Sequence, residues 1–314
     1  MPSPDGALID EVRARRLLVG PDSVCWRYCS DVRLDFAILY PLLLQVAHPT
    51  VGAGVRDFSQ FEQHPYERLL RTVDYVTLLV YGRDDAIAAA RRLRELHHRF
   101  RGVRDDGRRY SALEPRAYAW VHATLLQTYV AGHAHFGRPL SPTQVERFYA
   151  EYRGLGRLIG VGPRDLPSTW TGFCAYFARV IEEELELNDS VRRVLRAVGL
   201  AGPRFLPLPG PLWRLSRIPV GRAIWLGGVG LLAPDLRRRL EIPWAMADEL
   251  SFRTLGRLSR AMTPVMPERL QCAGPNQLRA RRSAIAAGPL GTARTGSARW
   301  PYPDPERAST VAAC

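Results

Sequence analysis

The seven histidines of this 314-residue chain are the residues whose type and spacing could most readily do chemistry. All of them lie between His48 and His135, and none follows in the second half of the chain. An imidazole can bind a metal through one ring nitrogen or exchange a proton near neutral pH. Surface residues scattered at random would rarely gather in this way, so the pattern favours a site built by the first half of the chain.

The neighbouring residues His97 and His98 face opposite ways on a predicted helix. His97 continues the apolar stripe formed by Ile87, Ala90 and Leu93, whereas His98 falls on a face rich in arginine and glutamate. A neutral imidazole on a buried apolar face suits one axial bond to haem iron. The alternative, which spacing alone favours, is a core histidine hydrogen-bonded to a backbone carbonyl.

His122 is the second candidate for a cofactor ligand. It shares a predicted helix face with Tyr118 and Leu126. A zinc site is disfavoured because the chain has no H-E-x-x-H motif, and because Cys25 and Cys29 have no second cysteine pair to complete a tetrahedral site.

A basic face is predicted on the helix that precedes these histidines. Arg68, Arg71, Thr72 and Tyr75 stand at i, i+3, i+4 and i+7 and therefore share one side. Two guanidinium groups and a hydroxyl could hold carboxylates or stabilise negative charge on bound dioxygen. A solvated basic face explains the same spacing equally well.

Composition excludes several other classes of protein. With 46% hydrophobic residues the chain can bury a sizeable core, and five cysteines are too few for a disulfide scaffold. The basic residues are all arginines, which excludes a Schiff-base lysine and a phosphate-loop lysine. The net charge of +13 would suit nucleic acid, but no helix-turn-helix core or basic repeat accompanies it, so no nucleic-acid partner is expected.

Cellular location is inferred from cysteine usage and apolar run length. Scattered cysteines indicate a reducing compartment, and the longest apolar stretches, 38–47 and 223–233, are shorter than the ~18 to 20 residues of a membrane span. We therefore expect a cytoplasmic protein with no transmembrane span. Peripheral membrane contact stays open, because the glycine-bearing stretch 224–232 could either pack against a neighbour or lie at a membrane surface.

Helical periodicity covers most of the chain and predicts an all-α fold with a single helical domain. The residues from 203 to 219 are expected to be a proline-punctuated connector, and those from 286 to 314 a disordered tail. The predicted helices are 34–48 with a kink at Pro41, 65–81, 84–101, 115–136, one that opens with a capping box at Ser141, 169–185, 190–198, 220–232, 234–240 and 243–262.

Several stretches in this order and spacing resemble a known family. The chain is similar to the haem-dependent oxygenases that include the mycophenolic-acid oxygenase MpaB and the catalytic domain of latex-clearing rubber oxygenases. The resemblance covers 23–282 and predicts a catalytic domain over 23–285, after an N-terminal segment 1–22 and before the tail 286–314. The stretches that carry it are LLLQVAHPTVGAGV (42–55), RLLRT (68–72), HHRFRG (97–102), WVHAT (120–124), PLSPTQVERFYAEY (139–152) and LLAPDLR (231–237).

The resemblance implies a b-type haem held by partly globin-like helix packing. The proximal histidine of the family maps onto His97, and its distal Arg and Thr map onto Arg68 and Thr72. Arg71 stands where the rubber-oxygenase branch has a lysine ligand, and a guanidinium coordinates iron poorly. Asp57 is the nearest acidic residue to the position of a proposed base in that branch.

The expected function is therefore a haem b oxygenase that uses dioxygen on a small apolar substrate, such as an unsaturated or isoprenoid chain. In this reading Arg71 and Thr72 stabilise charge on bound oxygen, and Arg68 orients Arg71 or pairs with a propionate. Two alternatives remain. One is a haem carrier or sensor without turnover, and the other is a basic helical protein that binds nucleic acid.

Overall fold

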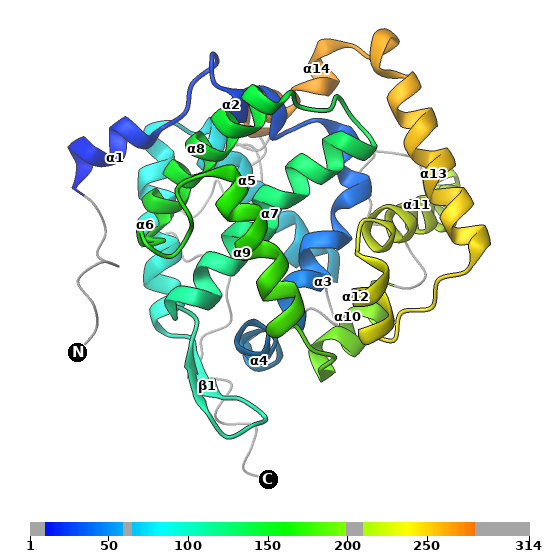
Figure 1. The fold of residues 1–314 in the computed structure, drawn as a ribbon. Coiled ribbons are helices and arrows are strands. Elements are labelled where there is room, and N and C mark those ends of the chain that lie inside the picture. Colours follow the sequence, from blue (N-terminus) through cyan, green and yellow to red (C-terminus); the bar gives the residue numbers. More distant parts are fainter. Residues whose placement is uncertain (1–9, 59–64, 199–209, 280–314) are drawn as a thin grey trace. The chain divides into compact units, whose positions relative to one another are not determined.

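The computed structural model describes residues 10–58, 65–198 and 210–279, of which 65–71, 198 and 210–217 are described by their backbone alone. Within these ranges the fold is all-α, as predicted, apart from one small hairpin of strands β1 (Arg101–Val103) and β2 (Arg109–Ser111) (Figure 1). The residues from 286 to 314 lie outside this part of the chain. The helices are α1 (Glu11–Leu17), α2 (Val24–Tyr28), η2 (Val32–Ala37), α3 (Leu39–Ala47), α4 (Pro49–Phe58), α5 (Pro65–Tyr81), α6 (Asp84–His98), α7 (Pro115–His135), α8 (Pro142–Ile159), α9 (Trp170–Glu183), α10 (Asp189–Val198), α11 (Gly210–Gly230), α12 (Pro234–Arg239), α13 (Met246–Ala261), η3 (Thr263–Val265) and α14 (Glu268–Gln271).

Helix α7 forms the centre of the core, where it packs against η2, α3 and α8. Its buried residues lie on every side of the helix rather than on one stripe, which is the pattern of a helix surrounded by protein. Trp120 is completely buried, and its indole nitrogen donates to the carbonyl oxygen of Leu44 on α3 at 2.9 Å. This bond satisfies the polar end of a large core side chain.

Helices α5 and α6 form an antiparallel hairpin that carries the candidate residues. Gly82 lies in the turn, where an added Cβ would collide with the carbonyl of Leu78, so the turn has room only for glycine. Both helices rise by about 1.5 Å per residue, so residues equally far from the turn come level with each other. His97 follows Gly82 by 15 residues (97 − 82) and Arg68 precedes it by 14 (82 − 68), which brings the two level.

The N-terminal part of the helical body differs from the prediction. One kinked helix was expected over 34–48, but the chain forms the 3₁₀ helix η2, then α3, and then a helix α4 that the sequence analysis did not anticipate. Pro49 explains the error, because it ends α3 and also occupies the first position of α4, where a missing N–H costs nothing. The segments 32–47 and 49–58 meet at 101°.

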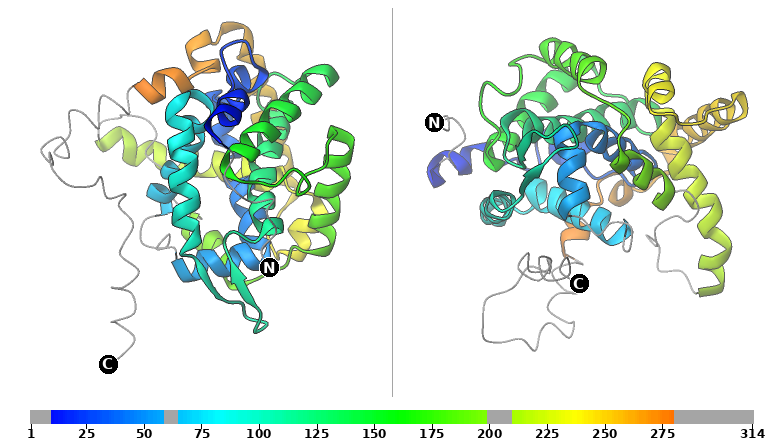
Figure 2. Two further views of the ribbon diagram at one scale, coloured as in Figure 1. Left: turned by 90° about the vertical axis from the view of Figure 1, so that its left-hand side faces the viewer. Right: turned by 90° about the horizontal axis from the view of Figure 1, so that it is seen from below.

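Two further boundaries also differ from the sequence-based expectation. The helix predicted over 84–101 ends at His98, because the next residues leave the helix to pair in the β-hairpin. The hairpin extends from the helical body beside α4 (Figures 1 and 2). The predicted connector 203–219 is wrong over its described part, since α11 begins at Gly210 and continues through Pro219; residues 203–209 lie outside the described part.

The glycines of α11 serve close packing. A Cβ on Gly227 would collide with the carbonyl of Phe36, and a Cβ on Gly228 would lie 2.5 Å from the Cβ of Leu39. Helix α11 therefore crosses η2 and α3 at very short range, and it also runs beside α13 (Figure 2). The glycine-bearing stretch 224–232 thus packs closely against its neighbours.

Membrane-spanning potential is limited to one bent pair of helices. No single helix in the described ranges has the length and hydropathy needed to cross a bilayer. The segments 32–47 and 49–58 reach that threshold only when they are taken together.

Candidate functional site

A cavity of about 160 Å³ lies among η2, α3, α5 and α7, with single contributions from α4, α10 and α11. Most of its wall is apolar, as the side chains of Leu42, Val76, Leu125 and Ile224 illustrate. Concave apolar sites with a few polar groups are the usual form of small-molecule sites in proteins. The cavity is therefore the first place to look for a bound organic molecule.

Helix α5 brings one of the predicted site residues to this cavity. Thr72 lines the wall together with Val73, Val76 and Thr77 of the same helix. Arg68 and Arg71 belong to α5 within the turn that precedes Thr72, but only their backbone is described. Of the predicted site residues, Thr72 is therefore the one on the described cavity wall.

His97 has the orientation that the helical pattern predicted. Its side chain is half-buried, whereas that of His98 is exposed. The Nδ1 atom of His97 lies 2.7 Å from the carbonyl oxygen of Leu93, and its ring packs edge-on against Phe100 at 5.6 Å and Tyr118 at 5.7 Å. His97 is not among the residues that line the described wall of the large cavity.

The contact with Leu93 has a chemical consequence for His97. A carbonyl oxygen only accepts hydrogen bonds, so Nδ1 must carry the proton and Nε2 is the nitrogen with a lone pair in the neutral ring. Histidines that bind metals commonly have one nitrogen fixed in this way by a backbone carbonyl. The donor set at His97 therefore fits an axial ligand of haem iron.

An unsatisfied hydroxyl lies in the same neighbourhood. Tyr75 on α5 has a buried hydroxyl with no hydrogen-bond partner among the described residues. Burial and the nearby Tyr118 raise the pKa of Tyr75, and Tyr118 also packs against His97. An orphaned buried hydroxyl is costly, and it is the kind of group that a bound cofactor or water would satisfy.

His122 occupies a different environment, in the interface between α7 and α8. Its Nε2 atom lies 2.9 Å from the carbonyl oxygen of Tyr152, and the two rings stack at 4.5 Å. A Cβ on Gly156 would lie 2.7 Å from the same nitrogen, so the ring fills a space that only glycine leaves open. Complete burial lowers the pKa of His122 to about 4. These contacts are those of a neutral core histidine.

The remaining described histidines are dispersed through the fold. His133 bonds through Nε2 to the carbonyl of Tyr28 at 2.8 Å, and His135 stacks on Phe252 at 3.8 Å. His48 lies 3.3 Å from a carboxylate oxygen of Glu184. The clustering of histidines in the first half of the sequence therefore does not become a cluster in space, at least among those the structure describes.

The acidic residues on the described cavity wall do not include the one that the sequence analysis named. Asp57 accepts a hydrogen bond from the Tyr110 hydroxyl at 2.7 Å and pairs with Arg56, and the described cavity wall does not include it. Asp35 lines the cavity, and burial together with the charge of Asp31 raises its pKa to about 7. The only sequence signal for Asp35 was a lone carboxylate within the apolar run LDFAIL.

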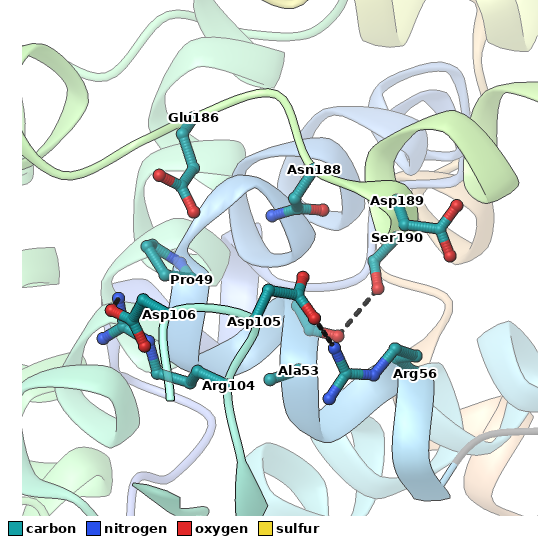
Figure 3. A pocket seen from close by; sticks show the side chains of 11 residues that line it. Pro49, Ala53, Arg56, Arg104, Asp105, Asp106, Glu186, Asn188, Asp189 and Ser190 are labelled. Atoms are coloured by element: carbon teal, nitrogen blue, oxygen red, sulfur yellow. Dashed lines mark hydrogen bonds and ion pairs between the residues drawn. The ribbon is translucent and has the colours of Figure 1, made fainter. Parts of the chain in front are cut away.

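A second, smaller cavity of about 80 Å³ is polar and lies where α4, the β-hairpin and the start of α10 meet (Figure 3). Arg56 forms an ion pair with Asp105 across it. The Ser190 hydroxyl donates to the carbonyl of Gly52 at 2.7 Å, and the Asn188 amide donates to that of Val46. These contacts link α3, α4, the β-hairpin and the segment at the start of α10, and none of the predicted site residues takes part in them.

Metal binding by a cluster of side chains has no support in the described residues. No three His, Cys, Asp or Glu side chains come together there in a way that could hold an ion. A haem iron held by one imidazole does not require such a cluster, because the porphyrin supplies the other ligands.

The chain has relatives among proteins of known sequence. Two uncharacterized proteins, one from Mycobacterium tuberculosis and one from Mycobacterium bovis, are each 27% identical over 233 residues, which is 73% of this chain and 88% of theirs. No solved structure matches significantly. Residues 26–261 match the family described as "ER-bound oxygenase mpaB/B'/Rubber oxygenase, catalytic domain". The chain, with its all-α fold and with this match over most of its length, therefore belongs to the MpaB and rubber-oxygenase family of oxygenase catalytic domains.

Proposed function

We propose that the protein is a haem b-dependent oxygenase in which His97 would hold the haem iron. The observation that supports the proposal is the 2.7 Å contact between Nδ1 of His97 and the carbonyl of Leu93, which places the proton of the neutral ring on Nδ1, so that Nε2 would be the atom to hold the iron. The hairpin of α5 and α6 supports it further, because His97 comes level with Arg68 and the same α5 carries Thr72 into the cavity wall. Haem, when bound, supplies the redox chemistry that activates dioxygen.

Three residues of α5 would stabilise negative charge near the iron: Arg68, Arg71 and Thr72. Arg71 stays protonated throughout the physiological range and is a poor metal ligand, so we expect it to attract anionic oxygen rather than occupy the iron. Thr72 would donate a hydrogen bond from its hydroxyl, and Arg68 would orient Arg71 or pair with a propionate. This role of Arg71 differs from that of the lysine ligand which stands at the same position in the rubber-oxygenase branch.

The substrate would be a small apolar molecule. Leu42, Val76, Leu125 and Ile224 give the cavity an apolar wall, and such a wall binds hydrocarbon through the hydrophobic effect. We propose an unsaturated or isoprenoid-like chain as the substrate class, with dioxygen as the second substrate. Membership in an oxygenase family supports this assignment.

The test compares two adjacent histidines. His97→Ala is expected to lose haem, seen as loss of the Soret band after haem supplementation, whereas His98→Ala is expected to retain it. The exposed side chain of His98 makes it a matched control for the half-buried His97. Loss of haem from the His98 variant alone would overturn the assignment, and a wild-type protein that takes up no haem would overturn the proposal as a whole.

Turnover separates the oxygenase from the haem carrier or sensor. The oxygenase predicts oxygen consumption when the haem-loaded protein meets an unsaturated apolar substrate, and the carrier predicts haem without consumption. An oxygen electrode with a series of terpenes and unsaturated fatty acids makes this distinction. Membership in an oxygenase family favours turnover.

We also propose that the protein works in the cytoplasm and without a nucleic-acid partner. Four free cysteines in the described chain, two of them buried side by side one turn apart, suit a reducing compartment. Several arginines are used within the fold: Arg33 pairs with Asp31, and Arg239 donates to the carbonyls of Ile181 and Leu185. Absence of salt-dependent DNA binding in a mobility-shift assay is the expected result.

A further inference from the structure

The large cavity has one acidic end. As far as its wall is described, its only acidic side chains are Asp31 and Asp35, both from the segment around η2, and no cationic side chain lines it. Two other polar side chains of the wall are engaged within the protein: the Gln45 amide donates to the Thr124 hydroxyl at 2.9 Å, and the Thr128 hydroxyl donates to the Thr124 carbonyl at 2.7 Å. The two aspartates are the charged groups of the described wall.

Asp31 is already neutralised within the protein. Arg33 approaches both of its carboxylate oxygens, through Nε at 2.9 Å and through a terminal nitrogen, and another terminal nitrogen of the same guanidinium bonds to Thr263. Both members of this pair are almost completely buried. Arg33 does not line the cavity, so its charge is committed to Asp31 on the side away from the open space.

Asp35 is left without a comparable partner. It stands one helical turn after Asp31 on the cavity wall, and no hydrogen bond or ion pair links its carboxyl group to any residue in the described ranges. A carboxyl group in an apolar wall that lacks a protein partner must be satisfied by water or by a ligand. Because most of the wall is apolar, that ligand would be largely hydrocarbon with a polar group at Asp35.

We propose that the cavity binds an apolar molecule with a single hydroxyl head group, and that the carboxyl group of Asp35 holds the hydroxyl. The hydrocarbon part lies against Leu42, Val76 and Leu125. That this alcohol is the substrate rests on the proposed oxygenase function and narrows its substrate class to alcohols. That the cavity binds such an alcohol is inferred from the cavity alone.

A neutral hydroxyl suits this carboxyl group better than a cation does. The pKa of Asp35 is raised to about 7, so both of its forms are present near neutral pH. A hydroxyl donates to the carboxylate and accepts from the carboxylic acid, whereas an ammonium group requires the carboxylate. Since Asp31 and Arg33 cancel each other, a cation would find only the partial charge of Asp35.

The other charged groups around η2 do not alter this conclusion. The elements packed against η2 are α3, α7, α11 and α14. On α7, His133 faces the Asp31–Arg33 pair and burial lowers its pKa, which favours the neutral ring. On α11, Arg222 is paired with Asp248. The described titratable groups of α3 and α14 are Tyr40, Glu268 and Arg269, and Asp31 is the charged group that affects the pKa of Asp35.

The test measures head-group preference by calorimetry on the full chain, loaded with haem where it takes haem. The probes are 1-octanol, its isomer methyl heptyl ether, which cannot donate a hydrogen bond, and octylamine. We expect the alcohol to bind about tenfold more tightly than the ether, the value for one hydrogen bond to a charged group. We also expect this preference to increase from pH 6 to pH 8, because the carboxylate accepts the stronger bond.

Three variants test whether the preference for the alcohol comes from Asp35. Asp35→Leu, similar in shape, is expected to abolish the preference for alcohol over ether, and Thr77→Val, another polar wall position, is expected to keep it. Asp35→Asn is expected to keep a preference that no longer changes with pH, which preserves the test if the leucine variant fails to fold. Equal binding of alcohol and ether by the wild type would overturn the proposal. So would a preference that survives Asp35→Leu, or tighter binding of the amine.

The absorption spectrum of the same samples separates this inference from the proposed function. A Soret band without alcohol preference would overturn the head-group assignment alone. Alcohol preference without a Soret band would overturn the haem proposal alone.

Discussion

Replacing Asp35 by asparagine is expected to stabilise the protein at pH 8 and to have little effect near pH 4. Asparagine has the same shape and carries no charge at any pH. In the wild type the folded-state pKa of Asp35 is raised to about 7 from an ordinary value of 3.8. Below pH 4 the carboxyl group is protonated in both the folded and the unfolded states, so the substitution removes no charge.

The difference in unfolding free energy between Asp35→Asn and wild type develops between pH 4 and pH 7. In this window the unfolded chain has released the proton that folded Asp35 retains, so wild-type stability falls as pH rises and levels off above pH 7. A pKa difference of about 3 corresponds to at most about 4 kcal/mol at ~1.36 kcal/mol for each tenfold step. Because the carboxyl group borders an open cavity, screening reduces the expected gain in Asp35→Asn to about 1 to 3 kcal/mol.

The assay is urea unfolding of both proteins at pH 5, 6, 7 and 8, followed by circular dichroism. The stability difference between Asp35→Asn and wild type should grow from pH 5 to pH 7 and level off toward pH 8. An exposed control, Asp22→Asn, should change the free energy of unfolding by less than about 0.5 kcal/mol. A difference that is constant with pH, or a variant less stable than wild type at pH 8, would refute the reasoning about the cavity.

Two further predictions concern the core. His122→Gln should make the free energy of unfolding less sensitive to acid between pH 6.5 and about pH 4. Burial lowers the pKa of His122 to about 4, so in this range the wild type takes up a proton at this residue only on unfolding, and its stability falls as the pH falls. Urea midpoints measured over this range test the prediction. Gly228→Ala should cost about 1 to 3 kcal/mol, since its Cβ would press on Leu39, whereas Gly20→Ala, with open space around it, should be tolerated; thermal unfolding compares the two.

Local sequence signals predicted the elements that depend on local physics. The helix 65–81 has the predicted bounds, and the capping box at Ser141 is present with both bonds between Ser141 and Gln144. Helical periodicity alone also predicted that the side chains of His97 and His98 face opposite ways. In each case a repeat of 3.6 residues or a cap within one turn determines the result.

The features that were missed depend on contacts between distant parts of the chain. Helix α11 continues through Pro219 while its later glycines pack against Phe36 and Leu39, contacts that composition does not reveal. Asp35 became a candidate only when η2, α3, α5 and α7 enclosed a cavity beside it. A lone aspartate in an apolar run has no periodic partner, so sequence alone could not distinguish a cavity wall from a surface turn.

The most direct test of the central claim, that His97 holds the haem iron, is ligand rescue. In His97→Gly the imidazole is removed and the space that it occupied beside Phe100 and Tyr118 remains. We expect this variant to lack a Soret band and to regain it when imidazole is added with haem, while His98→Gly keeps its haem throughout. A normal Soret band in His97→Gly without added imidazole would contradict the account.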